Sequence, residues 1–334
     1  METASSNNPN LFSGITKVDV TDSEITPVSV PIEQGVFSQP MLSLLFALPE
    51  TTMPDFTPLQ VKSRAAEAGY ALRCVVEICK AGTDQVLLHK AITPELQADG
   101  TYNISQQLSE GSYDIYLWAD YARLDDSLND AFYHTERLKA VTIFTEPYTA
   151  NTDAKDAAYG SESGAMVSSE GAAVTMSLKR PFAKYRITVD ADEIEKYLKL
   201  QKNDSQKFPP LDELAVSVQY EGYFPSGFNV LTEKPNNAVG GIVYTGSQVR
   251  YDGSAKELEL GSDWILVDGD SSFINATVII SDGKGNEVCC VPGTRIDYRR
   301  NYLTTISGRF LTSGVNSGGV DINTEWSGSF DVWF

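Results

Sequence analysis

Two apolar segments on either side of a proline-rich stretch constrain most strongly what this chain can fold into. Residues 41–48 and 72–78 both alternate large apolar side chains with smaller or polar ones. This period of two is what a β-strand imposes on its two faces. Residues 49–58 contain three prolines. Proline cannot donate to a central ladder, so we expect a surface connection between two strands here.

The alternation predicts which side chains of the two strands face a core. In the second strand we expect Arg73 and Glu77 to face outward. The inward side chains predicted for the first strand are Leu42, Leu44, Phe46 and Leu48, and those predicted for the second are Leu72, Cys74, Val76 and Ile78.

Length and composition favour two all-β domains. The chain has 334 residues, which suits two domains of about 150. Hydrophobic residues make up 42% and aromatic residues 10%, enough to build cores and to exclude a disordered chain. The 16 tyrosines, 25 glycines and 15 prolines are typical of strands joined by many turns. We divide the chain into a polar leader (1–36), an N-terminal domain (37–170) and a C-terminal domain (171–334).

The charge and the missing apolar runs exclude several classes of partner. A formal net charge of −19 argues against nucleic acid and against an anionic membrane surface. No run of about 20 apolar residues exists, so no transmembrane helix is expected. The first residues carry no basic and apolar signal pattern. Either the protein is cytosolic, or the sequence begins after a signal peptide that was removed.

Turn signals and short apolar runs predict strands through the rest of the chain. A composition shift over 145–173 towards small and polar residues places the domain boundary near its end. Asp190 is expected to cap a short helix that carries Ile194, Tyr197 and Leu198 on one face. The further strands are expected at 86–90, 102–104, 113–118, 140–144, 174–189 with a bend at Pro181, 214–220, 241–244, 257–260, 264–267, 273–280, 287–291, 302–310 and 320–334.

The sequence offers little that carries chemistry. The four cysteines, Cys74, Cys79, Cys289 and Cys290, have no metal-ligand spacing, and we interpret them as free thiols in strands. We interpret the two histidines, His89 and His134, as structural, because no triad or zinc motif accompanies them. We therefore predict no catalytic residue, no cofactor and no metal. The 45 acidic residues still allow a catalytic pair of carboxylates, because their spacing in the sequence does not say which of them meet in the fold. The aromatic residues that could form a sugar platform, if exposed, are Tyr220, Tyr223, Phe224, Phe228 and Trp264.

An apolar strand, a loop that ends in Arg64-Ala65 and a second hydrophobic strand resemble the fimbrillins of Bacteroidales surface pili. Five further segments are similar to that family and follow one another in the same order along the chain: 113–121, 130–133, 178–184, 300–306 and 325–326. The resemblance implies two tandem transthyretin-like β-sandwich domains, one or two short helices, export as a lipoprotein precursor and a place on the outer membrane. It also implies cleavage after Arg64, in the loop 49–66, by a protease of trypsin-like or arginine specificity.

In such pili the strand before the cut leaves, and a strand of another subunit refills its groove. The leaving strand here would be 41–48. A solvated loop arginine that is never cut is the alternative for Arg64. The segment 320–334 is the candidate donor, through Ile322, Trp326, Phe330, Val332 and Phe334, which share one parity. Its alternative is the last strand of the C-terminal domain itself.

The first functional hypothesis is therefore a structural pilin that assembles with copies of itself or related subunits. The second is a surface adhesin or a module that binds a host protein or glycan, such as a pilus tip or anchor component. An exposed aromatic patch would favour the second hypothesis. An enzyme is the third class, and a cleft with convergent, perturbed carboxylates would support it.

Overall fold

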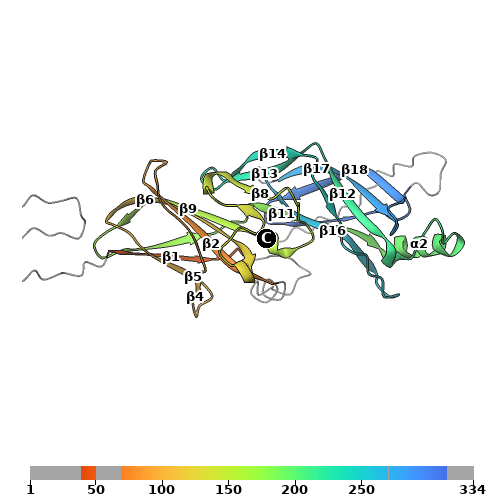
Figure 1. The fold of residues 1–334 in the computed structure, drawn as a ribbon, viewed down its shortest axis with the longest axis horizontal. Helices are drawn as coiled ribbons and strands as arrows, with labels where there is room; N and C mark the ends of the chain where they lie inside the picture. The colour runs from red at the N-terminus through yellow and green to blue at the C-terminus, as the bar shows by residue number, and fades with distance from the viewer. Residues whose placement is uncertain (1–38, 50–68, 270, 314–334) are drawn as a thin grey trace, which may run out of the picture. The chain divides into compact units, whose positions relative to one another are not determined.

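Alternating side chains organise most of the described chain into β-strands (Figure 1). The computed structural model describes residues 39–49, 69–269 and 271–313. The described part is mainly β-strand and contains one α-helix, which confirms the predicted all-β fold. Among the described residues, no helix is long and apolar enough to cross a membrane.

The N-terminal strands form two sheets that share a core. The first sheet has the order β10-β1-β5-β4 and the second has the order β3-β2-β6-β9. Side chains of both sheets meet in one buried cluster, which includes Leu44 of β1, Val76 of β2 and Leu117 of β6. The bounds are β1 Met41–Ala47, β2 Tyr70–Lys80, β3 Val86–Ile92, β4 Glu95–Leu96, β5 Tyr102–Gln107, β6 Gly111–Arg123, β9 Ala158–Val167 and β10 Ala172–Ser177. We call these two sheets the N-terminal pair.

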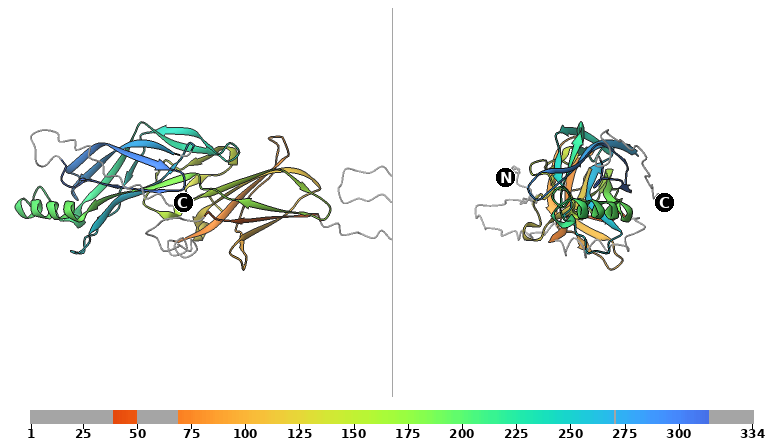
Figure 2. Two further views of the ribbon diagram at one scale, coloured as in Figure 1. Left: turned by 180° about the vertical axis from the view of Figure 1, so that it is seen from behind. Right: turned by 90° about the vertical axis from the view of Figure 1, so that its right-hand side faces the viewer.

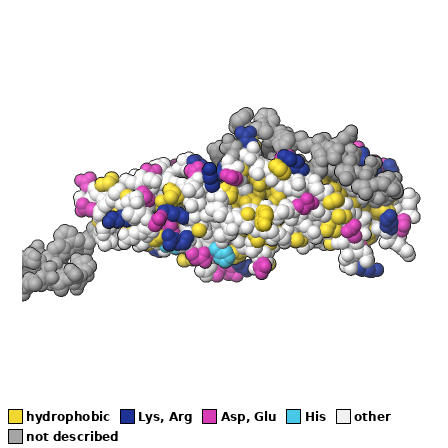
Figure 3. Space-filling model, turned by 90° about the horizontal axis from the view of Figure 1, so that it is seen from above, with side chains coloured by type: hydrophobic (Ala, Val, Ile, Leu, Met, Phe, Trp, Pro, Cys, Tyr) yellow, Lys and Arg dark blue, Asp and Glu magenta, His cyan; other side chains and the backbone are white. Residues whose placement is uncertain are grey.

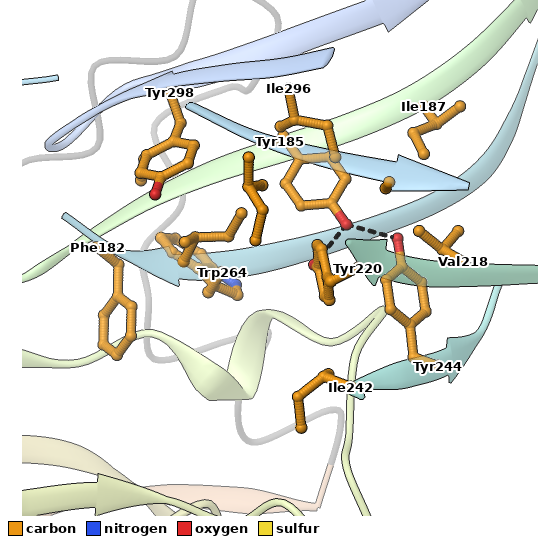
Figure 4. Close-up of a cluster of buried hydrophobic side chains, with 14 of the residues drawn as sticks. Phe182, Tyr185, Ile187, Val218, Tyr220, Ile242, Tyr244, Trp264, Ile296 and Tyr298 are labelled. Carbon is orange, nitrogen blue, oxygen red and sulfur yellow. Dashed lines mark hydrogen bonds between the residues drawn. The ribbon is translucent and has the colours of Figure 1, made fainter. Parts of the chain in front are cut away.

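The C-terminal strands form a second set of two sheets. One of these sheets has the order β16-β11-β19, and the other has the order β15-β12-β17-β18. Figure 4 shows side chains of both sheets meeting between them. The bounds are β11 Phe182–Asp190, β12 Ala215–Glu221, β15 Val243–Thr245, β16 Glu257–Leu266, β17 Ser271–Ser281, β18 Glu287–Arg299 and β19 Leu303–Ser307. We call these sheets the C-terminal pair.

The two pairs repeat one topology. In each pair the first strand is central, next to a parallel last strand (β1 with β10, β11 with β19) and an antiparallel strand (β1 with β5, β11 with β16). The facing sheets also correspond, because β3-β2-β6-β9 and β15-β12-β17-β18 are both antiparallel throughout. Strand β11 is therefore the topological equivalent of β1.

A third sheet joins the two pairs. Its order is β14-β13-β8-β7, so that strands from early and late parts of the sequence share one ladder. It lies over the face of β2 and β6 that points away from the first sheet, and Val75, Trp118 and Phe228 share a single large core there. The bounds are β7 Tyr133–His134, β8 Val141–Ile143, β13 Tyr223–Asn229 and β14 Lys234–Gly240.

The helix α2 (Ala191–Asn203) begins as the sequence predicts. The Asp190 carboxylate accepts a hydrogen bond from the Glu193 backbone N–H at 2.9 Å, which satisfies one of the free donors of the first turn. Tyr197 and Ile194 are buried on one face. Figure 2 shows α2 in the part of the fold that holds the C-terminal pair. Short 3-10 turns lie at Leu124–Asp126, Leu138–Ala140, Asp153–Lys155 and Leu211–Glu213.

Several sequence expectations need correction. Strand β9 was not predicted within the small and polar stretch 145–173, and β10 begins at Ala172, two residues before the strand expected at 174; the backbones of β9 and β10 complete the second and first sheets. Strands β13 and β14 were not predicted, since Pro225, Gly227 and Pro235 are typical of turns. Strand β16 is one continuous strand where two were predicted.

The orientation of β2 also differs from expectation. Arg73 and Glu77 were expected to face outward, but both are buried, because the third sheet and its 3-10 turn cover that face of β2. Strand β10 lies beyond residue 170, the predicted end of the N-terminal domain, and yet pairs with β1. The strands of the first sheet therefore extend to the end of β10. The division into two transthyretin-like domains stays a prediction.

Candidate functional site

Strand β1 fills a groove between two other strands of the first sheet. Its backbone pairs with β10 on one side and β5 on the other, over nearly its whole length. Leu42, Leu44 and Phe46 are 0%, 0% and 1% exposed, and Leu48 packs against the same core. The four residues predicted to share the inner face therefore do so. Without β1, two ladders would lose their partner and this core would open to water.

Two contacts fix where β1 begins. The Leu108 backbone N–H donates to the Pro40 carbonyl oxygen at 3.0 Å, which continues the ladder just before the strand. Gly171 has a φ of +93°, and a Cβ placed on it would lie 2.4 Å from the Met41 carbonyl oxygen. The turn before β10 thus needs glycine both for its left-handed backbone and for the close approach of β1.

The side chains of β1 make few polar contacts. Among the described residues, one hydrogen bond starts from a β1 side chain, in which Ser43 Oγ donates to Asn103 Oδ1 at 2.7 Å. The backbone ladders and the apolar side chains thus hold this strand.

A small cavity lies at the end of β1. Leu48 and Pro49 form one wall, and the Arg180–Asp156 ion pair, with Nε and Oδ1 2.6 Å apart, forms another. Burial opposes the charge of Arg180, but the Asp156 carboxylate outweighs this effect and raises the pKa of the guanidinium. The remaining lining residues are Leu72, Ala119, Tyr121, Ala157 and Ala158.

The equivalent strand of the C-terminal pair lies beside a buried polar network. Lys155 Nζ is 2.6 Å from Asp263 Oδ1, and both side chains are buried. Tyr148 and Tyr220 donate hydrogen bonds to Asp263 Oδ2 at 2.5 Å and 2.8 Å. Tyr185 of β11 continues the network, as Figure 4 shows, through hydroxyl contacts of 2.5 Å to Tyr220 and 2.8 Å to Tyr244.

The ionisation of this network is set mainly by burial. Burial lowers the pKa of Lys155, and Asp263 counteracts only part of that effect. Burial, followed by the Asp263 charge, raises the pKa of Tyr148 and Tyr220 well above the ordinary tyrosine range. The tyrosines therefore remain neutral donors, and the network cross-links β11, β12, β15 and β16 with the segment before β9.

Two buried charges of β2 also have partners. Arg73 donates to both carboxylate oxygens of Asp120 at 2.8 and 2.7 Å and to Asp130 at 2.8 Å. Burial opposes its charge, but hydrogen bonding to Asp120 prevails and raises the pKa of Arg73. Glu77 Oε2 lies 3.1 Å from His89 Nδ1 and accepts from the Leu138 backbone N–H at 3.3 Å. These contacts lower the pKa of Glu77 despite the opposing effect of burial.

One group of side chains has the composition of a metal site. The ligand atoms of Asp130, His134 and Glu136 lie within 4.8 Å of one another. The Asp130 carboxylate, however, is already bound by Arg73, and both its oxygens accept hydrogen bonds from Thr135. This use of Asp130 by its protein partners favours a structural role for the group.

The predicted aromatic platform does not form as a group. Tyr223 of β13 is 81% exposed. Tyr220, Phe224, Phe228 and Trp264 are buried in the large core, where aromatic faces pack against one another. The cysteines agree with the interpretation as free thiols, of which Cys74, Cys79 and Cys289 are buried and Cys290 is partly buried.

Two groups of predicted site residues lie outside the described residues. They are the proposed cleavage site, Arg64-Ala65, and the candidate donor residues Ile322, Trp326, Phe330, Val332 and Phe334. The sequence reasoning missed Tyr102 and Asn103 of β5, which contact β1 directly. Their signal was only the alternation of residues 102–104, because no local pattern pairs a strand with a partner 60 residues away.

Comparisons with known proteins place the chain in a family and beside several solved structures. A protein-family profile described as "Family of unknown function (DUF6562)" matches residues 38–332. No curated protein matches. The similar solved structures include a candidate adhesin from Bacteroides ovatus, at 13% identity and a TM-score of 0.46, covering 82% of this chain and 90% of that one.

Two fimbrial proteins of Porphyromonas gingivalis are also similar in structure. The anchor protein Mfa2 has 11% identity and a TM-score of 0.41, covering 80% of this chain and 90% of that one. The tip protein Mfa3, with a C-terminal truncation, has 10% identity and a TM-score of 0.37, covering 80% and 95%. At these scores the likeness assigns no function to this chain.

Proposed function

Because the chain belongs to a family of unknown function (DUF6562), its function has to come from its own geometry, and we propose that it is a structural subunit of a cell-surface pilus. Subunits assemble when β1 leaves its groove and a strand of another subunit replaces it. The observation that carries this proposal is the position of β1, a short central strand that the backbone and three buried apolar side chains hold in place.

The energetics of the groove favour replacement over vacancy. Departure of β1 would leave the edges of β5 and β10 unpaired and expose the side chains that cover Leu42, Leu44 and Phe46. Unpaired edges and exposed apolar surface favour association with another strand. A strand that enters the groove restores the main-chain hydrogen bonds, and its alternate side chains refill the core. Strand loss in one subunit is thus coupled to binding of the next.

The rest of the fold supports a subunit that survives this exchange. The third sheet joins β8 of the N-terminal part to β13 of the C-terminal part. The Arg180–Asp156 ion pair and the Lys155–Asp263 pair connect further segments on either side of residue 170. None of these contacts involves β1, so its departure leaves the joining sheet in place.

Processing, export and partners belong to the same proposal. Cleavage after Arg64 by an arginine-specific protease would free β1 from β2, and the segment 320–334 would supply the donor strand. A lipoprotein precursor exported to the outer membrane would deliver the subunit to the cell surface. The interspersed acidic and basic side chains in Figure 3 suit a surface exposed to water. We assign the protein no catalytic chemistry.

Limited trypsin digestion of the folded protein tests the proposal. Mass spectrometry is expected to show a cut after Arg64 and loss of the fragment that carries β1, and electron microscopy is expected to show filaments. The matched control replaces both trypsin sites of the loop, Lys62→Ala together with Arg64→Ala, and should retain β1 and stay monomeric under the same digestion. A cut product that remains monomeric with its groove open, or that keeps β1 bound indefinitely, contradicts the proposal.

One observation favours a second function, binding of a surface ligand. Tyr223 is 81% exposed on β13, and Phe273 of β17 is half exposed, with the Arg295 guanidinium 3.8 Å from its ring centre. Exposed aromatic faces are typical of glycan contacts. A binding screen against oligosaccharides tests this function, because Tyr223→Ala should abolish a true signal and leave assembly unchanged.

A further inference from the structure

The groove around β1 is not uniform along its length. On each side of β1, the inward neighbours become larger from the start of the strand to its end. Leu42 lies between Ala172 and Gln106, Leu44 between Val174 and Ile104, and Phe46 between Met176 and Tyr102. A strand in this groove therefore meets a small and polar first position, an aliphatic middle position and a large, aromatic last position.

Tyr102 makes the last position specific for a ring. The rings of Phe46 and Tyr102 are stacked, with centroids 5.7 Å apart and planes 18° apart. The two residues are also direct partners in the antiparallel ladder, which brings their side chains together. An offset aromatic pair contributes more than the apolar area that it buries. An aliphatic side chain at this position would bury area but would lose that contribution.

The side-chain amide of Asn103 contacts the outward face of β1. Its Nδ2 donates to Ser105 Oγ at 3.2 Å, and its Oδ1 accepts from Ser43 Oγ at 2.7 Å. The first contact fixes the amide so that the oxygen points to β1. The position after the first inward residue of β1 therefore favours a short side chain that donates a hydrogen bond, namely serine, threonine or asparagine.

We propose that the groove selects the sequence and register of the incoming strand, with Tyr102 and Asn103 as the residues that read it. The selected pattern is an apolar residue, then a short hydrogen-bond donor, then an apolar residue or threonine, then any residue and then an aromatic residue, in the direction that runs parallel to β10. This inference rests on the proposed function, because it names the partner of the same groove. The occupant is residues 322–326 of a second copy of this chain, where Ile322, Asn323, Thr324 and Trp326 take the first, second, third and last positions. Residues 330–334 do not fit the pattern, because Asp331 has no donor at the second position.

The two-residue period of the side chains along a strand explains why Tyr102 and Asn103 set the register. A shift by one residue turns every inward side chain outward, so the core excludes it. A shift by two residues keeps the same face inward but places a residue without a ring beside Tyr102 and moves the hydrogen-bond donor away from Asn103. Backbone pairing and apolar burial alone would tolerate that shift. The contacts with Tyr102 and Asn103 would be lost in that shift.

Peptide exchange on the cleaved protein tests this inference. A site for a sequence-specific protease is placed within residues 50–68 of the full chain, and the protein is cut after folding. Synthetic peptides with the sequence of residues 39–49 are then added, either unchanged, with Phe46→Leu, or with Ser43→Ala. Native mass spectrometry measures the replacement of the fragment that carries β1 by each peptide. The same series is run on Tyr102→Leu and on Tyr102→Phe, which keeps the ring.

The inference predicts that the Phe46→Leu peptide binds about three- to tenfold more weakly than the unchanged peptide. This difference should disappear in Tyr102→Leu and persist in Tyr102→Phe, as a coupled pair requires. The Ser43→Ala peptide should bind more weakly by a smaller factor. Exchange of all peptides with equal affinity overturns the inference and leaves the proposed function standing. Failure of every peptide to enter the cut protein overturns both.

Discussion

Strands β1 and β11 occupy equivalent positions in the two sheet pairs, but different forces hold them there. Both are central, with one parallel and one antiparallel neighbour. From β11, Lys184 pairs with Asp153, Tyr185 contacts Tyr220 and Tyr244, and Arg186 donates to Thr305. From β1, Ser43 donates to Asn103. One topology thus carries a strand anchored by polar side chains and a strand held mainly by apolar contacts.

This difference would make β1 the easier of the two equivalent strands to exchange, as the proposed function requires. Apolar side chains and backbone ladders carry little sequence specificity, so another alternating strand can replace them. Buried polar partners have fixed geometry, and a replacement strand would leave them unsatisfied. Substitutions that remove one kind of attachment at a time should separate the two strands.

Removal of the Asp263 carboxylate should cause the largest loss of stability. Asp263→Ala leaves the buried Lys155 ammonium without its partner, and Tyr148 and Tyr220 lose their acceptor. Breaking a buried ion pair costs about 3–5 kcal/mol. Urea unfolding should show this loss, whereas Asp297→Ala, in the exposed pair with Arg295, should change little. Equal behaviour of the two variants would show that the network does not anchor the C-terminal pair.

Truncation of Phe46 should weaken the N-terminal pair by packing alone. Phe46→Ala removes a fully buried ring and its stack on Tyr102, at a cost of about 3 kcal/mol. Leu45→Ala is the matched control, because Leu45 is the adjacent, outward-facing residue of the same strand and is only partly buried. Thermal unfolding should separate the two variants clearly. A similar loss for both would mean that the inner face of β1 is not what holds it.

The turn before β10 should be sensitive to a single methyl group. Gly171→Ala brings a Cβ against the Met41 carbonyl oxygen, in addition to the cost of a positive φ. Gly164→Ala has a similar positive φ but meets nothing within 4 Å. The difference between the two variants, on the order of 1–2 kcal/mol, isolates the contact with β1. If both variants lose equal stability, β1 does not approach Gly171 this closely.

Acid should remove a smaller contribution that lies outside both central strands. The pKa of Glu77 is lower in the folded chain than its ordinary value of 4.5. Its ionised form therefore stabilises the fold above about that pH, and this contribution is lost as the pH falls through the folded-state pKa. Glu77→Gln should flatten the fall in unfolding free energy between about pH 5 and 3. Glu136→Gln, at an exposed position, should retain the wild-type profile.

The sequence predicted the part of this comparison that depends on local alternation. The inner face of β1 and the cap of α2 follow from periodicity and capping, and the structure confirms them. Long-range coverage could not be predicted in the same way. Arg73 and Glu77 are charged and yet buried, and their partners come from neighbouring strands (Asp120 of β6, His89 of β3) and from the segments before and after β7 (Asp130 and Leu138). No residue near Arg73 or Glu77 in the sequence predicts that these side chains are buried.

The candidate site shows the same limit. Alternation identified Leu42, Leu44 and Phe46, but their neighbours Tyr102 and Met176 are distant in sequence and come together only through the sheet order. Strands β13 and β14 were missed because they are rich in proline, glycine and asparagine, and the pairing of β13 with both β14 and β8 overrides those local preferences. The cleavage and donor residues stay predictions.

Native-state hydrogen exchange of the amides of β1 and β11 tests the central claim most directly. We expect the amides of β1 to exchange through a local opening at a clearly lower free energy than those of β11, which should open only when the C-terminal pair unfolds. Peptide-resolved mass spectrometry, under conditions in which each opening recloses faster than the amide exchanges, gives both opening free energies in one experiment. Equal protection of the two strands, lost together in global unfolding, would contradict the account of β1 as the exchangeable strand.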